Sequence, residues 1–194
     1  MATTTLRQLN NLDETPASLA EATVILIDFQ NTYTSGTMEL DGWAEAVAEG
    51  KKLLTAARQA GATIIHVQDQ GYEPETEGGK IIADVAPIDG EHRVIKSVPN
   101  AFHNTNLAEL VEKAGHENLV LAGFMTNMCV LFTAQGAFLN GKRPTVVAKA
   151  CATRALPTTA AGQEHISAQH IHDGALATIT ELYGVVVPTT GDLK

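Results

Sequence analysis

The sequence predicts a single α/β domain with three layers, α/β/α, around a six-stranded and mostly parallel sheet. Short apolar runs rich in β-branched residues alternate with stretches of helical period, and 194 residues suit one such domain. Right-handed crossovers between parallel strands favour a doubly wound, Rossmann-like arrangement. Residues 1–20 are polar and aperiodic, so we expect an N-terminal arm there and one domain over residues 21–194.

The predicted elements follow the alternation that this class requires. Residues 23–27 are a continuous apolar run, typical of a strand buried on both faces, and a helical stripe over 41–60 ends before Gly61. Further strands are expected at 62–67, 94–96, 118–122, 145–148 and 185–187, and further helices around 107–111, from an N-cap at Thr126 to Asn140, and over 159–182.

Composition excludes several classes of protein. Lys plus Arg is 13 and Asp plus Glu is 22, a formal charge of −9, which argues against nucleic-acid and membrane-surface partners. Hydrophobic residues are 44% and charged residues 18%, so a globular protein is expected. Two cysteines and an N-terminus without the pattern of a signal peptide predict a cytoplasmic protein with free thiols.

Chemistry is expected beyond the carboxyl ends of the strands, where ligands bind in open parallel sheets. Asp28, Lys96 and Cys129 follow three different strands. A cysteine near a helix start gains thiolate character from the helix dipole, a carboxylate can accept its proton, and a lysine favours the anionic states. A small core cysteine, a strand-end carboxylate that caps a turn and a solvated lysine are the alternative interpretation of the same residues.

Three segments resemble the signatures of the isochorismatase-like cysteine hydrolase superfamily. They are Asp-Phe-Gln-Asn at 28–31, Lys96 in Val-Ile-Lys-Ser, and Gly-Phe-Met-Thr-Asn-Met-Cys-Val at 123–130; residues 175–185 also resemble its last helix and strand. The resemblance implies a six-stranded parallel sheet and a catalytic triad of Asp28, Lys96 and Cys129. It also implies a cis peptide bond, expected between Phe124 and Met125, and a homo-oligomer, a dimer or larger. The arm, or the helix that precedes the last strand, is expected to contribute to the contact between copies.

The leading functional hypothesis is a cysteine-dependent hydrolase that cleaves a small amide or ureido C–N bond through a thioester. Backbone N–H groups of Met125 and Cys129 are the expected oxyanion hole. Side chains expected around the substrate are Phe29, Gln30, Tyr72, Phe102, Phe124 and Met128. An isochorismatase-type vinyl-ether hydrolase, with Arg93 and Lys96 near the substrate, and a non-catalytic interaction protein of the same fold are the alternatives.

We expect neither a metal nor another cofactor. Nicotinamidases of the superfamily resemble one another in an Asp-x-His segment that holds a metal, whereas Gly71 stands here where that histidine would follow Asp69. One carboxylate with the upstream His66 does not supply three converging ligands. His165, His170 and His172 are expected to be solvated or at an interface. The expected partners are a small-molecule substrate and further copies of the chain.

Overall fold

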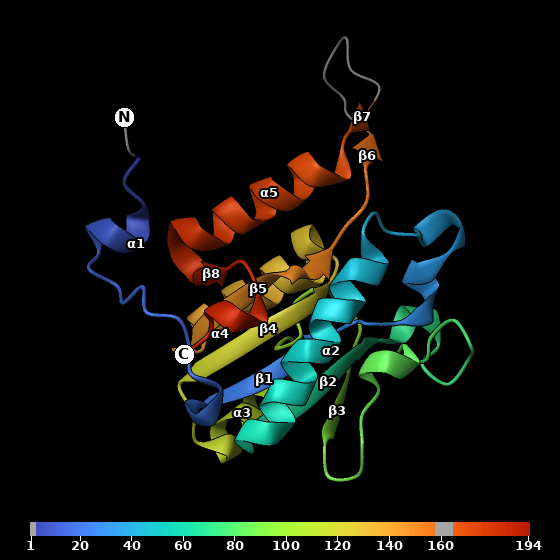
Figure 1. Cartoon of the computed structure of the whole chain (residues 1–194), viewed down its shortest axis with the longest axis horizontal. Helices are drawn as coiled ribbons and strands as arrows, with labels where there is room; N and C mark the ends of the chain where they lie inside the picture. The colour runs from blue at the N-terminus through green and yellow to red at the C-terminus, as the bar shows by residue number, and fades with distance from the viewer. Residues whose placement is uncertain (1–2, 158–164) are drawn as a thin grey trace.

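The computed structural model describes residues 3–157 and 165–194, and it contains the expected three-layered domain (Figure 1). Six parallel strands form the central sheet in the order β3-β2-β1-β4-β5-β8. Their bounds are β1 Ala22–Ile27, β2 Thr63–Asp69, β3 His92–Lys96, β4 Asn118–Phe124, β5 Arg143–Ala152 and β8 Val185–Val187. The order reverses between β1 and β4, so the topology is doubly wound as predicted.

Helices cover both faces of the sheet because its central strands are apolar on both sides. In β1, Val24 and Leu26 face the core under α2, whereas Ile25 and Ile27 face the core under α3 and α4. Figure 1 shows α2 in front of the sheet and α3 and α4 behind it. The helices are α2 Trp43–Ala60, α3 Leu107–Ala114, α4 Leu131–Leu139 and α5 Ala168–Thr178.

The helix predicted over 159–182 begins later than expected. Residues 158–164 lie outside the described part, and a short antiparallel pair, β6 Leu156–Pro157 and β7 His165–Ile166, replaces helix around them. The helix α5 begins after Ser167, whose hydroxyl accepts a hydrogen bond from the His170 N–H and caps it. A π-helical turn, Ile179–Tyr183, continues α5, so the predicted end of the helix is close to the observed one.

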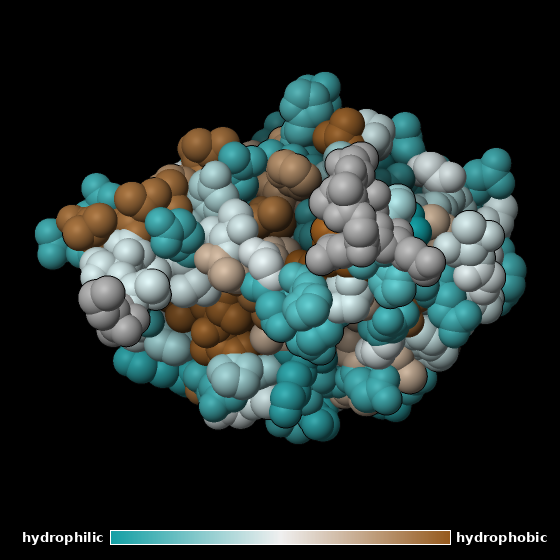
Figure 2. All heavy atoms as spheres, turned by 90° about the horizontal axis from the view of Figure 1, so that it is seen from above, coloured by the Kyte–Doolittle hydropathy of each residue, from teal (hydrophilic) through white to brown (hydrophobic). Residues whose placement is uncertain are grey.

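The N-terminal segment lies along its own domain over the described residues 3–20. Arg7, in the short helix α1 (Leu6–Leu9), donates to the carbonyl of Leu182, and the Ala17 N–H donates to the Thr145 hydroxyl. Figure 2 shows hydrophobic side chains gathered on this side of an otherwise mixed surface, and Leu6 and Leu9 are 43% and 66% exposed. The homo-oligomer stays a prediction, and these exposed leucines are candidates for its contact surface.

No helix in the described residues is long and apolar enough to cross a membrane.

The backbone is unusually tight where β1 and β4 end side by side. Gly123 has φ of +135°, and a Cβ at this position would lie 1.9 Å from the Ile27 carbonyl oxygen, so only glycine fits. Asp28, the residue after β1, has φ of +50°, in the left-handed region that non-glycine residues seldom adopt. Residues held in such conformations are concentrated at functional sites, and both of these adjoin the candidate site.

Candidate active site

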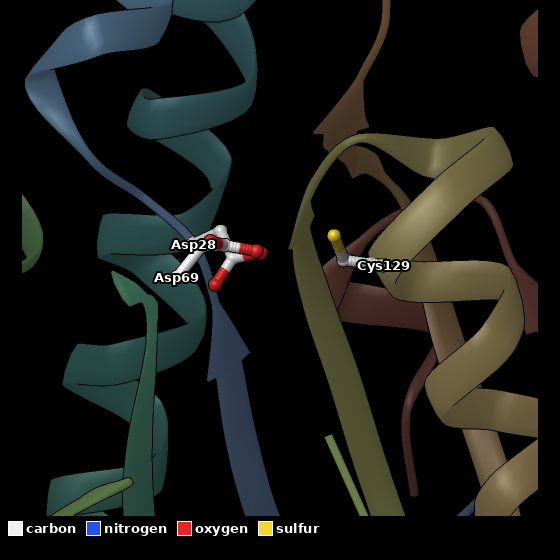
Figure 3. A group of neighbouring side chains, drawn as sticks. All are labelled: Asp28, Asp69 and Cys129. Atoms are coloured by element: carbon white, nitrogen blue, oxygen red, sulfur yellow. The ribbon is translucent and has the colours of Figure 1, made fainter. Parts of the chain in front are cut away.

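Four polar side chains meet at the carboxyl end of the sheet, because parallel strands all end at the same edge. Asp28 follows β1, Asp69 ends β2, Lys96 ends β3, and Cys129 lies in the turn after β4. Figure 3 shows both carboxylates directed from their strand ends toward the sulfur of Cys129 at the start of the facing helix. The structure therefore brings the three predicted catalytic residues together and adds Asp69 to them.

The ammonium of Lys96 is the centre of this group (Asp28, Asp69, Lys96 and Cys129), which we call the catalytic cluster after the role predicted for three of its members. Its Nζ lies 2.7 Å from Asp28 Oδ2, 2.8 Å from Asp69 Oδ2 and 3.3 Å from Cys129 Sγ. Lys96 is 1% exposed and Asp28 is fully buried. The alternative interpretation expected Lys96 to be solvated, but it is buried. Its positive charge is balanced by the two carboxylates, as burial of a charge requires.

Burial and charge set the protonation states of the catalytic cluster. Burial raises the pKa of Asp28 to about 6, although Lys96 opposes the shift. Burial would lower the pKa of Lys96, but Asp28 and Cys129 raise it above its ordinary value. Burial and the Asp28 carboxylate raise the pKa of Cys129 to about 12, so the helix start does not produce the lowered value expected from the sequence. The thiol thus keeps its proton at rest, beside a carboxylate that can accept it.

The turn that carries Cys129 differs from the predicted helix start. Met125 occupies the N-cap position, the Phe124–Met125 peptide bond is cis as expected, and residues Thr126–Val130 form a π-helical turn before α4. Thr126 does not cap the helix, because its hydroxyl lies 2.9 Å from His172 Nδ1 of α5. His172 is therefore half-buried and has a partner within its own chain, and burial lowers its pKa. Its hydrogen bond ties α5 to the turn that carries Cys129.

The catalytic cluster could in principle hold a metal, since ligand atoms of Asp28, Asp69 and Cys129 lie within 4.8 Å of one another. The Lys96 ammonium, however, lies within 3.3 Å of an atom of each of these three residues. An ion bound by the same atoms would meet a like charge at the centre of the group. The residues present fit an internal ammonium better than a metal ion.

Three of the side chains predicted around the substrate are buried. Phe29 and Phe124 are 1% and 0% exposed, and their rings pack edge to face with centroids 4.7 Å apart in the core under α2. Gln30 is fully buried: its amide N–H donates to the Gly79 carbonyl, and its oxygen accepts from the Asp69 N–H at 2.8 Å. Gln30 therefore holds the end of β2 that carries Asp69.

The other predicted pocket residues are only partly buried. The Tyr72 hydroxyl lies 3.2 Å from that of Tyr33, a buried residue that sequence reasoning did not single out. Met128 packs on the core behind the sheet. Phe102 lines a cavity of about 330 Å³ with residues of α3 and with Asn140 and Lys142, beyond the end of α4 that lies away from Cys129.

Sequence reasoning missed two contributors for different reasons. Asp69 lies at the carboxyl end of a strand, as Asp28 and Lys96 do, so its position in the sequence indicates that it belongs to the site. His172 carried no such signal, because its partner Thr126 is 46 residues away in the sequence.

Comparisons with known proteins give one consistent result. Residues 22–189 match the family described as Isochorismatase domain. The crystal structure of an isochorismatase from Pseudomonas putida superposes with a TM-score of 0.93 at 38% identity, covering 100% of both chains. The uncharacterized isochorismatase family protein YddQ of Bacillus subtilis is 34% identical over 88% of this chain and 98% of its own. Ureidoacrylate amidohydrolase RutB of Caulobacter vibrioides is 28% identical over 92% of each.

Proposed function

The chain belongs to the isochorismatase family of hydrolases, and we propose that it hydrolyses a small amide or ureido C–N bond through a thioester on Cys129. The observation that carries this proposal is the position of the thiol, 3.3 Å from the Lys96 ammonium and in one group with the Asp28 carboxylate. A nucleophile beside a base is the arrangement that activates a thiol for acyl transfer, and the nearby cation balances the negative charge that forms. Similarity to an amidohydrolase supports the same reaction class.

In the first half of the reaction, Asp28 takes the thiol proton and the sulfur attacks the carbonyl carbon. The negative charge then develops on the carbonyl oxygen, toward which the backbone N–H groups of Met125 and Cys129 would donate. The first turn of a helix leaves such groups unpaired, and each donor of this kind contributes about 3 kcal/mol in acyl transfer. Collapse of the intermediate breaks the C–N bond, and the nitrogen leaves with the proton held by Asp28.

In the second half, water attacks the thioester. Asp28 accepts a proton from that water as its oxygen bonds to the acyl carbon, and the C–S bond then breaks to release the carboxylic acid. The proton returns to sulfur, which restores the resting state. Lys96 stays protonated throughout and balances the negative charge, which moves between Asp28, the sulfur and the oxyanion.

The test is to capture the thioester. Enzyme mixed with small primary amides and N-carbamoyl compounds and quenched in acid should gain the mass of the acyl group on the Cys129 peptide. Cys129→Ala should lower kcat by about 10³-fold or more with the fold intact. Cys151→Ala is the matched control, because Cys151 is a second buried thiol whose sulfur donates to the Val147 carbonyl.

Cys129→Ala and Asp28→Asn together distinguish the thioester mechanism from the vinyl-ether alternative. That reaction needs protonation and water attack, so Cys129→Ala would then keep its activity while Asp28→Asn lost it. Its substrate would also need cationic partners, yet Arg93 donates to Gln68 and pairs with Glu75. Full activity of Cys129→Ala on any amide would refute the thioester mechanism.

A further inference from the structure

The catalytic cluster carries one more negative than positive charge. A single ammonium, Lys96, is shared by the carboxylates of Asp28 and Asp69. Transfer of the thiol proton to Asp28 creates one anion and removes another, so the sum does not change during attack. A substrate therefore meets an excess negative charge both at rest and in the reactive state.

Asp69 is the carboxylate that an incoming molecule meets. Its side chain is 21% exposed, whereas those of Asp28 and Lys96 are 0% exposed. The Gly71 N–H donates to Asp69 Oδ1 at 2.8 Å, and Lys96 holds Oδ2, so the carboxylate has a fixed direction. Gln30 holds the backbone of Asp69 as well. A rigid, accessible carboxylate is suited to recognise a particular group of a ligand.

The loops that follow β1 and β2 extend this negative field. Residues 31–42 and 70–80 contain five acidic residues and one basic residue, Lys80, which pairs with Glu77 at 3.4 Å; Arg93 of β3 pairs with Glu75 at 3.3 Å, so three of the five are in neither pair. The acidic residues are Glu39, Asp41, Glu73, Glu75 and Glu77. Charges of one sign around an entrance raise the local concentration of ligands of the opposite sign.

Building on the proposed function, we propose that Asp69 makes this site select amides that carry a protonated amine close to the scissile carbonyl. A carboxylate oxygen of Asp69 and the sulfur of Cys129 lie within 4.8 Å of each other. When the acyl carbon is bonded to that sulfur, an ammonium on its α or β carbon can reach the carboxylate. An acyl group with its own carboxylate would instead be repelled.

The first test uses thiol reagents and needs no turnover. Aminoethyl, methyl and sulfonatoethyl methanethiosulfonate carry a positive charge, no charge and a negative charge, and labelling is followed on the Cys129 peptide by mass spectrometry. Relative to the rates with free cysteine, wild-type enzyme should favour the cationic over the anionic reagent by about tenfold or more. Asp69→Asn should remove about tenfold of this preference, and high salt should weaken it in the wild type.

Two comparisons separate selection from general effects. Glu112→Gln on α3 removes one charge far from the site, at a side chain that is 81% exposed, and should keep the preference within about twofold of the wild type. If Asp69 only positioned Lys96, Asp69→Asn would change the reactivity of the thiol toward all three reagents equally. The ratio of the labelling rates with the cationic and the anionic reagent would then stay unchanged. An unchanged ratio in Asp69→Asn overturns the proposal.

The second test compares three primary amides of equal chain length: β-alaninamide, butyramide and succinamate. We expect kcat/KM to fall in that order, with about a tenfold difference between β-alaninamide and butyramide. Asp69→Asn should abolish this difference. Equal hydrolysis of all three would refute cation selection and leave the proposed amide hydrolysis intact. Hydrolysis of none, with labelling that still depends on Asp69, would count against the proposed function alone.

Discussion

Two ionic groups each include a residue of β2, His66 within the strand and Asp69 at its end, and they differ in how completely their atoms are bonded. Away from the carboxyl edge, Glu91 accepts two hydrogen bonds from Arg58 at 2.7 and 3.0 Å, one from the Ile88 N–H, and contacts His66 at 2.8 Å. At the carboxyl edge, Oδ1 of Asp28 is buried without a hydrogen-bond partner among the described residues. We call the first group the structural network (Arg58, His66 and Glu91).

The two carboxyl groups consequently have pKa values shifted in opposite directions. Burial would raise the pKa of Glu91, but its hydrogen bonds lower it to about 2, whereas burial prevails at Asp28 and raises its pKa to about 6. The structural network thus stabilises the charged state of its acid. The catalytic cluster keeps a carboxylate that can take a proton, and ionisation of Asp28 lowers the stability of the fold as the pH rises from 3.8 through about 6. Deeper burial and fewer hydrogen bonds distinguish Asp28 from Glu91.

The largest effect is expected from replacing Asp28, the proposed base. Asp28→Asn should lower kcat/KM by about 10³-fold or more, because a neutral amide cannot accept the thiol proton. In the wild type, kcat/KM should rise with pH through about 6 as Asp28 ionises. Steady-state rates between pH 4.5 and 8 measure both. A rate that does not change over this range would show that Asp28 is not the base.

Glu91→Gln should separate the structural network from catalysis. A pKa lowered from 4.5 to about 2 corresponds to about 3 kcal/mol of stability at neutral pH, at about 1.4 kcal/mol per pKa unit. The folded-state pKa is depressed, so this stabilisation is present above pH 4.5 and is lost as the pH falls toward 2. Urea unfolding at pH 7 should show the loss, and at pH 3 the variant and wild type should differ less. The kcat value should stay within about twofold of the wild type.

The smallest effect, no change, is expected from metal removal. Because the Lys96 ammonium contacts all three possible ligand residues, incubation with EDTA should leave kcat unaltered. The assay compares treated enzyme with enzyme that is then supplied with zinc, iron or manganese. Loss of activity that one of these metals restores would mean that the catalytic cluster binds an ion in its working state.

The sequence by itself determined the fold class and the position of the reactive groups along the chain. Continuous apolar runs such as residues 23–27 specify strands buried on both faces, and parallel strands must end at one edge. Asp28, Lys96 and Cys129 were therefore predictable as neighbours from local pattern, strand order and family resemblance. The start of α5 is predictable in part, since Ser167 is a good N-cap.

Only the tertiary structure decided which neighbours each of these groups has. Whether Phe29 packs in the core under Gly50 or faces a substrate depends on how α2 lies on the sheet. Likewise, Thr126 bonds to His172 rather than capping its own helix, and Asp69 shares the ammonium of Lys96. Burial, which shifts the pKa values of Asp28 and Cys129, is a property of the whole packed chain. Local patterns specify elements, but distances between residues far apart in sequence arise only when those elements pack.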